Sequence, residues 1–167
     1  MRRHLLKLIV PILATACGGE AREAAEQAQT RAAIADAEST ATRAAAMPAT
    51  GLWTEAHLMD RLVRTGVLPR VREGAPPSAP WMGQPPIALN AGGGEVYAWI
   101  YADSTARKAV TDQLDARSAT PSGRTSPFAI PMLMVVNNNL VAVITGGSVA
   151  NQERIMLALQ AGLPVRP

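Results

Sequence analysis

The stretch FAIPMLMVVNNNLVAVIT, residues Phe128–Thr145, contains the clearest β-hairpin pattern of this 167-residue chain. Apolar, β-branched runs bounded by turn residues predict strands, here over Phe128–Val136 and Leu140–Thr145. Asparagine tolerates a positive φ better than most residues with a side chain, so Asn137–Asn139 predict the connecting turn. Both faces of this hairpin are apolar. One face is expected to be core, and the other is expected to be core, a dimer surface or a covered edge.

A second pair of strands is expected upstream, over Ile87–Asn90 and Glu95–Tyr101. The glycine-rich segment Ala91–Gly94 between them fits a tight turn. The second of these strands is apolar on both alternating faces, which is typical of a central strand. Its two faces carry Val96, Ala98 and Ile100 on one side and Tyr97, Trp99 and Tyr101 on the other.

Three amphipathic helices are predicted around these strands, over Glu55–Thr65, from Ser104 to about Arg117, and over about Val149–Ala161. Arg72–Pro86 contains five prolines and is expected to be a loop that Trp81 pins to the core. The element order α, β, β, α, β, β, α predicts an α+β fold. We expect a small antiparallel sheet of about four strands, with helices mainly on one face.

The segment before this domain is rich in alanine and poor in residues that fill a core. Alanine is the best helix former, yet the segment lacks an apolar stripe for a coiled coil. We expect a helical or disordered tether. The predicted organisation is therefore a leader over 1–16, the tether over 17–50 and the α+β domain over 51–167.

The leader has the order of a bacterial export signal. Charged residues Met1–His4 precede the apolar run Leu5–Leu13, which is too short to span a membrane, and small residues lead to Cys17. Leu13-Ala14-Thr15-Ala16-Cys17 resembles the cleavage motif of bacterial lipoproteins, although the family prefers leucine where Ala14 stands. The resemblance implies cleavage before Cys17 and fatty acyl chains such as palmitate on it.

Two alternatives to a lipoprotein signal stay open: an ordinary secretory signal cut after Ala16, and a retained signal anchor. Arg2 and Arg3 also resemble a twin-arginine export signal, so the export route stays open as well. By the rule known for enteric bacteria, Gly18 after the cysteine fits delivery to the outer membrane, facing the periplasm.

The basic character of the chain belongs to the leader. Arg2, Arg3 and Lys7 precede Cys17, and without them the 16 basic residues fall to 13, equal to the 13 acidic ones. No surplus of positive charge then remains for nucleic-acid phosphates, so no nucleic-acid partner is expected.

Few residues suggest catalysis or metal binding. His57 is the only histidine after the leader, and Cys17 is the only cysteine. A zinc site needs about four ligands, and a serine-type triad needs a positioned histidine. We expect no catalytic residues, no metal and no cofactor. An enzyme would need a perturbed acid such as Asp103 or Glu95 in a cleft.

The strongest candidate binding surface is the aromatic row Tyr97, Trp99 and Tyr101, together with Trp81. Aromatic rings stack on sugars and on partner side chains. The alternative is that the row packs under a helix or against the proline-rich loop and Trp81.

The span Glu95–Gly162 resembles a βαββα-type domain of uncharacterised bacterial lipoproteins. Its aromatic strand ends in Tyr101-Ala102-Asp103, and an alanine-rich helix, an apolar hairpin and a final helix follow. This resemblance implies fold and anchoring, and no activity. A weaker similarity is to peptidoglycan-binding domains of βαββα order. The sequence therefore predicts a lipid-anchored, non-catalytic envelope protein that binds a protein or has a structural role, or else a glycan-binding module that uses the aromatic row.

Overall fold

The computed structural model describes residues 18–163, so the expectations for the leader 1–16 and for Cys17 lie outside the described residues. Contacts divide the chain into two compact units, one ending at Arg43 and the other beginning at Ala44.

One long helix, α1, runs over Gly18–Ala46, and most of it belongs to the first unit. Its 29 residues span about 44 Å at 1.5 Å per residue. Every α1 residue whose side chain is described is exposed, including the large aliphatic Ile34. The helix therefore has no buried apolar face within its described part, as the missing stripe in its sequence indicated.

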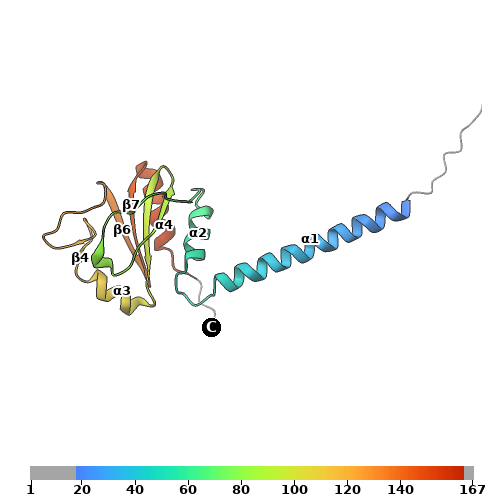
Figure 1. The fold of residues 1–167 in the computed structure, drawn as a ribbon, viewed down its shortest axis with the longest axis horizontal. Helices are drawn as coiled ribbons and strands as arrows, with labels where there is room; N and C mark the ends of the chain where they lie inside the picture. The colour runs from blue at the N-terminus through green and yellow to red at the C-terminus, as the bar shows by residue number, and fades with distance from the viewer. Residues whose placement is uncertain (1–17, 164–167) are drawn as a thin grey trace, which may run out of the picture. The chain divides into compact units, whose positions relative to one another are not determined.

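The second unit is an α+β domain built on an antiparallel five-stranded sheet in the order β1-β2-β3-β7-β6 (Figure 1). Consecutive strands β2–β3 and β6–β7 form hairpins, and β3 pairs with β7 at the centre. The strands are β1 Arg70–Val71, β2 Ile87–Ala91, β3 Gly94–Ile100, β6 Met132–Asn137 and β7 Leu140–Gly146. Strand β1 is the addition to the four strands that the sequence predicts.

The two hairpin turns use the residues that the sequence indicates. Gly92 and Gly93 have φ values of 60° and 79°, and Asn138 has a φ of 50°. These left-handed conformations suit glycine and asparagine. The strand expected from Phe128 instead begins at Met132. Phe128 is buried against Tyr97 and Trp99, which explains the later start.

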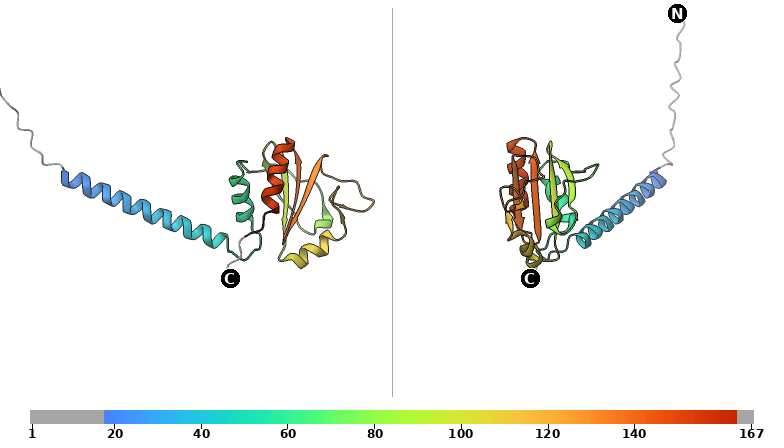
Figure 2. Two further views of the ribbon diagram at one scale, coloured as in Figure 1. Left: turned by 180° about the vertical axis from the view of Figure 1, so that it is seen from behind. Right: turned by 60° about the vertical axis from the view of Figure 1, so that its left-hand side comes forward.

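One face of the sheet is covered by two helices, α2 (Glu55–Arg64) and α4 (Val149–Gln160), as both views of the ribbon show (Figures 1 and 2). Leu58 and Leu62 of α2 and Ile155 and Leu159 of α4 are fully or almost fully buried there. They pack on the inward side chains of β3 and β7, namely Val96, Ala98, Leu140, Ala142 and Ile144. This is the larger of the two cores.

The other face is covered mostly by irregular chain. The 3-10 turn η1 (Pro80–Met82), Phe128 and the helix α3 (Ser104–Thr111) lie over it. Helix α3 ends earlier than expected, because a small two-stranded ladder of β4 (Leu114–Asp115) and β5 (Thr120–Pro121) follows. Ala106 and Ala109 of α3 are exposed, and only Val110 of α3 packs on this core.

Candidate functional site

The aromatic row lies in the second core. Tyr97 and Trp99 are each 1% exposed, and Tyr101 is half-buried. Trp99 Nε1 donates to the Gln84 carbonyl at 3.0 Å, and the Tyr101 hydroxyl donates to the Met82 carbonyl at 3.0 Å. Both acceptors belong to the proline-rich segment that covers this face.

Trp81 attaches the same proline-rich segment to the backbone near Ala119. Its Nε1 donates to the Ala119 carbonyl at 3.0 Å, and the Arg124 guanidinium lies 5.8 Å from its ring centroid. Tyr97, Trp99, Tyr101 and Trp81 are therefore brought together, but as a core. The expectation of an exposed aromatic surface is corrected, and the alternative of packing against the proline-rich loop is the observed arrangement. The reason is that the side chains on both faces of β3 are apolar and must be buried. Few helical residues lie over the second face, so the proline-rich segment buries it.

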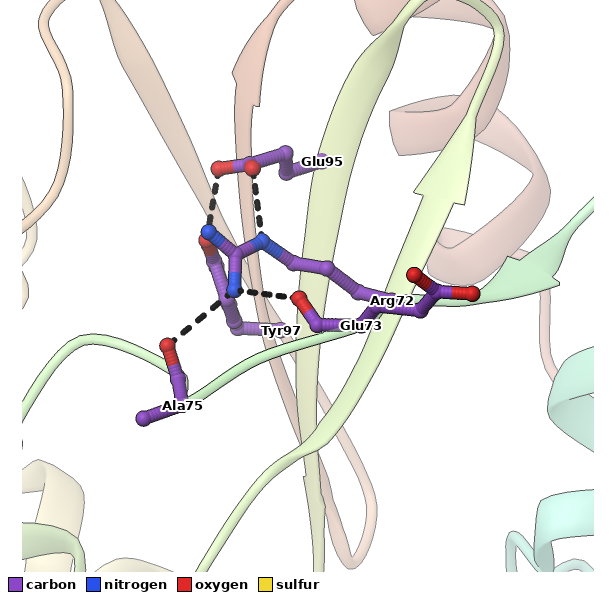
Figure 3. A network of polar contacts seen from close by, with 5 residues as sticks. All are labelled: Arg72, Glu73, Ala75, Glu95 and Tyr97. Carbon is purple, nitrogen blue, oxygen red and sulfur yellow. Dashed lines mark hydrogen bonds and ion pairs between the residues drawn. The ribbon is translucent and has the colours of Figure 1, made fainter.

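A polar network at the rim of this core joins β3 to the segment after β1 (Figure 3). Arg72 Nε donates to Glu95 Oε1 at 2.7 Å, and the Tyr97 hydroxyl donates to Glu95 Oε2 at 2.5 Å. A further Arg72 nitrogen donates to the carbonyls of Glu73 and Ala75 at 3.3 and 3.1 Å. Both oxygens of Glu95 thus have a partner, so the network holds the start of the proline-rich segment against the sheet.

The same contacts shift the pKa values of Glu95 and Tyr97. The hydrogen bond from Tyr97, and then that from Arg72, holds the pKa of Glu95 below its ordinary value of 4.5. Burial, and then the bond to Glu95, raises the pKa of Tyr97 to about 12. Burial raises the pKa of Tyr101 to about 12 as well. A general base works best with a pKa near the working pH, so this arrangement does not favour Glu95 as a base.

A hollow of about 560 Å³ lies at the glycine-rich end of the sheet, beside Glu95. Arg70 at its wall is exposed, and its guanidinium makes no hydrogen bond or ion pair within the described part of the chain. The hollow combines this cation with apolar and backbone surface, which suits a ligand with an acidic group. Its wall consists of Leu68, Arg70, Asn90, Ala91, Gly92, Gly93, Gly94, Glu95, Ala129, Thr145 and Gly146.

Two glycine segments approach closely at this end. A Cβ on Gly94 would lie 2.4 Å from the Thr145 carbonyl oxygen and 2.7 Å from that of Gly146. A Cβ on Gly147 would lie 3.1 Å from the Gly92 carbonyl oxygen. Gly92–Gly94 therefore form the tight turn that the sequence predicts. They also allow a close contact between the backbones of two strands.

His57 is 7% exposed and belongs to the first turn of α2. Its Nδ1 lies 3.0 Å from Thr54 Oγ1 and accepts from the Thr54 amide at 3.3 Å, which completes a capping box. Burial lowers the pKa of His57 below 6.5, so the ring is neutral at pH 7 and can accept. It lines a second hollow of about 540 Å³, where Asp60 and Arg64 form an ion pair with each other.

The residues that sequence reasoning undervalued are the three asparagines of the β6–β7 turn. Asn139 is 2% exposed, and its Oδ1 accepts from the Trp53 amide at 2.7 Å. Its Nδ2 donates to the carbonyls of Trp53 and Tyr101 at 3.1 and 2.8 Å. Asn138 donates to the Gly51 carbonyl, and Asn137 donates to the last carbonyls of α4. Three consecutive amides in one turn were the only sequence pattern that could have indicated this role.

Asp103, the other acid considered for catalysis, caps a helix instead. Asp103 Oδ1 accepts from the Ala106 amide at 2.8 Å and caps α3, exposed to solvent. Among residues 18–163, no group of three or more His, Cys, Asp and Glu side chains is placed to hold a metal ion. Within the same residues, no helix combines the length and the apolar character needed to cross a bilayer.

Comparison with known proteins found no match for this chain among protein-family models, curated proteins or solved structures. Its function is therefore inferred from its sequence, its fold and the geometry of its own residues.

Proposed function

We propose that this chain is a bacterial envelope lipoprotein, anchored through acyl chains on Cys17 and facing the periplasm, whose α+β domain binds a partner and catalyses no reaction. The observation that carries the proposal is the order charged residues, short apolar run, small residues and Cys17 at the start of the chain. The long α1 helix supports it, because a helix whose described side chains are all exposed is suited to holding a domain away from a membrane.

The binding part of the proposal rests on the hollow beside Glu95. Its apolar wall and Arg70, which has no ionic partner among residues 18–163, fit a partner that presents an acidic group. Glu95 and His57 are occupied by structural hydrogen bonds, which supports binding over acid–base chemistry. The aromatic row gives no support to glycan binding, because Tyr97 and Trp99 are buried and Tyr101 is half-buried.

Anchoring is tested by metabolic labelling with an alkyne analogue of palmitate in cells that express the full chain. We expect label on the wild type and none on Cys17→Ser. Globomycin, which blocks the lipoprotein signal peptidase, should make a labelled precursor accumulate. Equal label on the two chains, or no change with globomycin, contradicts the anchoring proposal.

Binding at the hollow is tested by photo-cross-linking in the same cells. Benzoylphenylalanine in place of Ala129, at the wall of the hollow, should give a discrete adduct, and adding Arg70→Glu should abolish it. The matched control carries the probe in place of Val63, which is 51% exposed on α2. The same adducts from both positions, or no effect of Arg70→Glu, contradict this site.

A further inference from the structure

Strand β6 forms an open edge of the sheet. It pairs with β7 on one side, and it stands last in the strand order. Within residues 18–163, no backbone hydrogen bond joins its other side to another segment. A row of unpaired N–H and C=O groups of this kind is a template for another strand.

The register of the hairpin identifies the outward groups. Asn137 pairs with Leu140 across a two-residue turn, so these two residues exchange the closing hydrogen bonds. Hydrogen bonding to the neighbour alternates along an antiparallel strand. The N–H and C=O groups of Met132, Met134 and Val136 therefore point away from β7, toward the open side.

The two edges of the sheet differ in how they are protected. Strand β1 at the opposite edge has only two residues, begins with an arginine, and is flanked by Pro69 and Arg72. Short length, proline and positive charge are the usual devices against edge-to-edge pairing. Strand β6 is preceded by Pro131, but from Met132 to Asn137 it is six residues long, uncharged and free of proline and glycine.

Exposed apolar side chains lie on β6 and just before it. Val136 is 41% exposed on the strand itself, and Ile130, two residues before the strand, is 83% exposed. Helix α4, which packs over β6, exposes Val149 and Leu157 at 67% and 62%, together with the charged Glu153 and Arg154. A strand partner on this edge would therefore remove apolar side chains from water in addition to pairing backbone groups.

We propose that the occupant of this edge is a second copy of the chain, paired antiparallel through β6 about a two-fold axis at Met134. A two-fold axis places each residue beside its own equivalent, so any charge near it would meet a like charge. Met132–Asn137 carries no charge, which makes the edge complementary to itself. In this register, Met134 faces Met134 of the other copy, Met132 faces Val136, and the two five-stranded sheets become continuous.

The experiment is disulfide cross-linking of the full chain in a Cys17→Ser background, where an introduced cysteine is the only thiol. Hydrogen-bonded residues on facing strands have Cα atoms about 5.5 Å apart, which a disulfide can bridge. Met134→Cys should give a covalent dimer on mild oxidation in cells. The matched control Val63→Cys, exposed on α2, should stay monomeric.

A second substitution tests whether the outward backbone groups of β6 are needed for the pairing. Val136→Pro, added to Met134→Cys, removes an outward N–H and leaves the bonds to β7 intact, so we expect loss of the dimer. A monomer from Met134→Cys, a mixed disulfide with another protein alone, or a dimer that survives Val136→Pro overturns the proposal. The cross-linking is done without Cys17, so a negative result does not bear on the anchoring proposal. The labelling experiment tests that proposal separately.

Discussion

At the scale of single residues, the buried side chain of Asn139 connects parts of the domain that are distant in sequence. Its amide bonds both backbone groups of Trp53 and the carbonyl of Tyr101, as a neighbouring strand would. The segment before α2 and the end of β3 are thus tied to one turn. Buried backbone groups need such partners, since water cannot reach them.

Replacing Asn139 by alanine should destabilise the domain strongly. The Trp53 amide and two carbonyls would lose their partners, and unmet buried groups cost about 1–3 kcal/mol each before relaxation. We expect a loss of about 3 kcal/mol in the free energy of unfolding, measured by urea denaturation. Asn138→Gly, which keeps the positive φ and loses one hydrogen bond, should cost about 1 kcal/mol or less. Similar losses for the two variants would contradict the role of Asn139.

The two tyrosines of the chain provide a spectroscopic test of the second core. Tyr97 and Tyr101 both have a pKa raised to about 12, whereas an unfolded tyrosine ionises near 10. The unfolded chain therefore releases these protons first, and stability should fall as pH rises from 10 to 12. Tyrosinate absorbance at 295 nm should be nearly absent at pH 10.5 in the folded protein and appear on adding urea. Ionisation near pH 10 without urea would mean that the rings are exposed.

Glu95 gives the opposite pH dependence. Its pKa is lowered on folding, so its contribution is present above the ordinary value of 4.5 and is lost as pH falls through the lower folded value. Thermal unfolding from pH 6 to pH 3 should show a steeper decrease in Tm for the wild type than for Glu95→Gln. Parallel curves would show that the Arg72–Glu95–Tyr97 network adds no pH-dependent stability.

At the scale of elements, the pairing of β3 with β7 depends on a glycine that permits close contact. Gly94→Ala should cost about 2 kcal/mol or more, because its Cβ would overlap backbone oxygens of Thr145 and Gly146, which cannot move without disturbing the ladder. Gly93→Asn in the same turn should cost about 1 kcal/mol or less, since its φ of 79° suits asparagine and its site is open. Chemical denaturation compares the two, and equal costs would contradict the close approach.

Most elements could be predicted because their local patterns agree with their final packing. The hairpins, α2 and α4 follow from apolar periodicity and from turn or cap residues such as Thr54 and Asn138. The bounds of α3 and the start of β6 could not, since Phe128 and Leu114 take their positions from the need to cover the second face. The burial of Tyr97, Trp99 and Tyr101 could not be predicted for the same reason. Alternation along the strand shows that they share a face, but it does not show which segment covers that face.

At the scale of the whole molecule, the chain combines two parts of opposite character. The α1 helix exposes all its described side chains, whereas the domain buries both faces of its central strands. The formal charge without residues 1–16 is balanced, so no general electrostatic attraction to nucleic acid is expected. This division suits a protein whose location depends on its first residues and whose interactions depend on its domain.

The most direct test of that view is mass spectrometry of the N-terminal peptide from the membrane-extracted protein. We expect the peptide to begin at Cys17 and to carry the added mass of a diacylglyceryl group, with or without an acyl chain on the new amino group. A peptide that begins at any other residue, or one that begins at an unmodified Cys17, would contradict the lipid anchor.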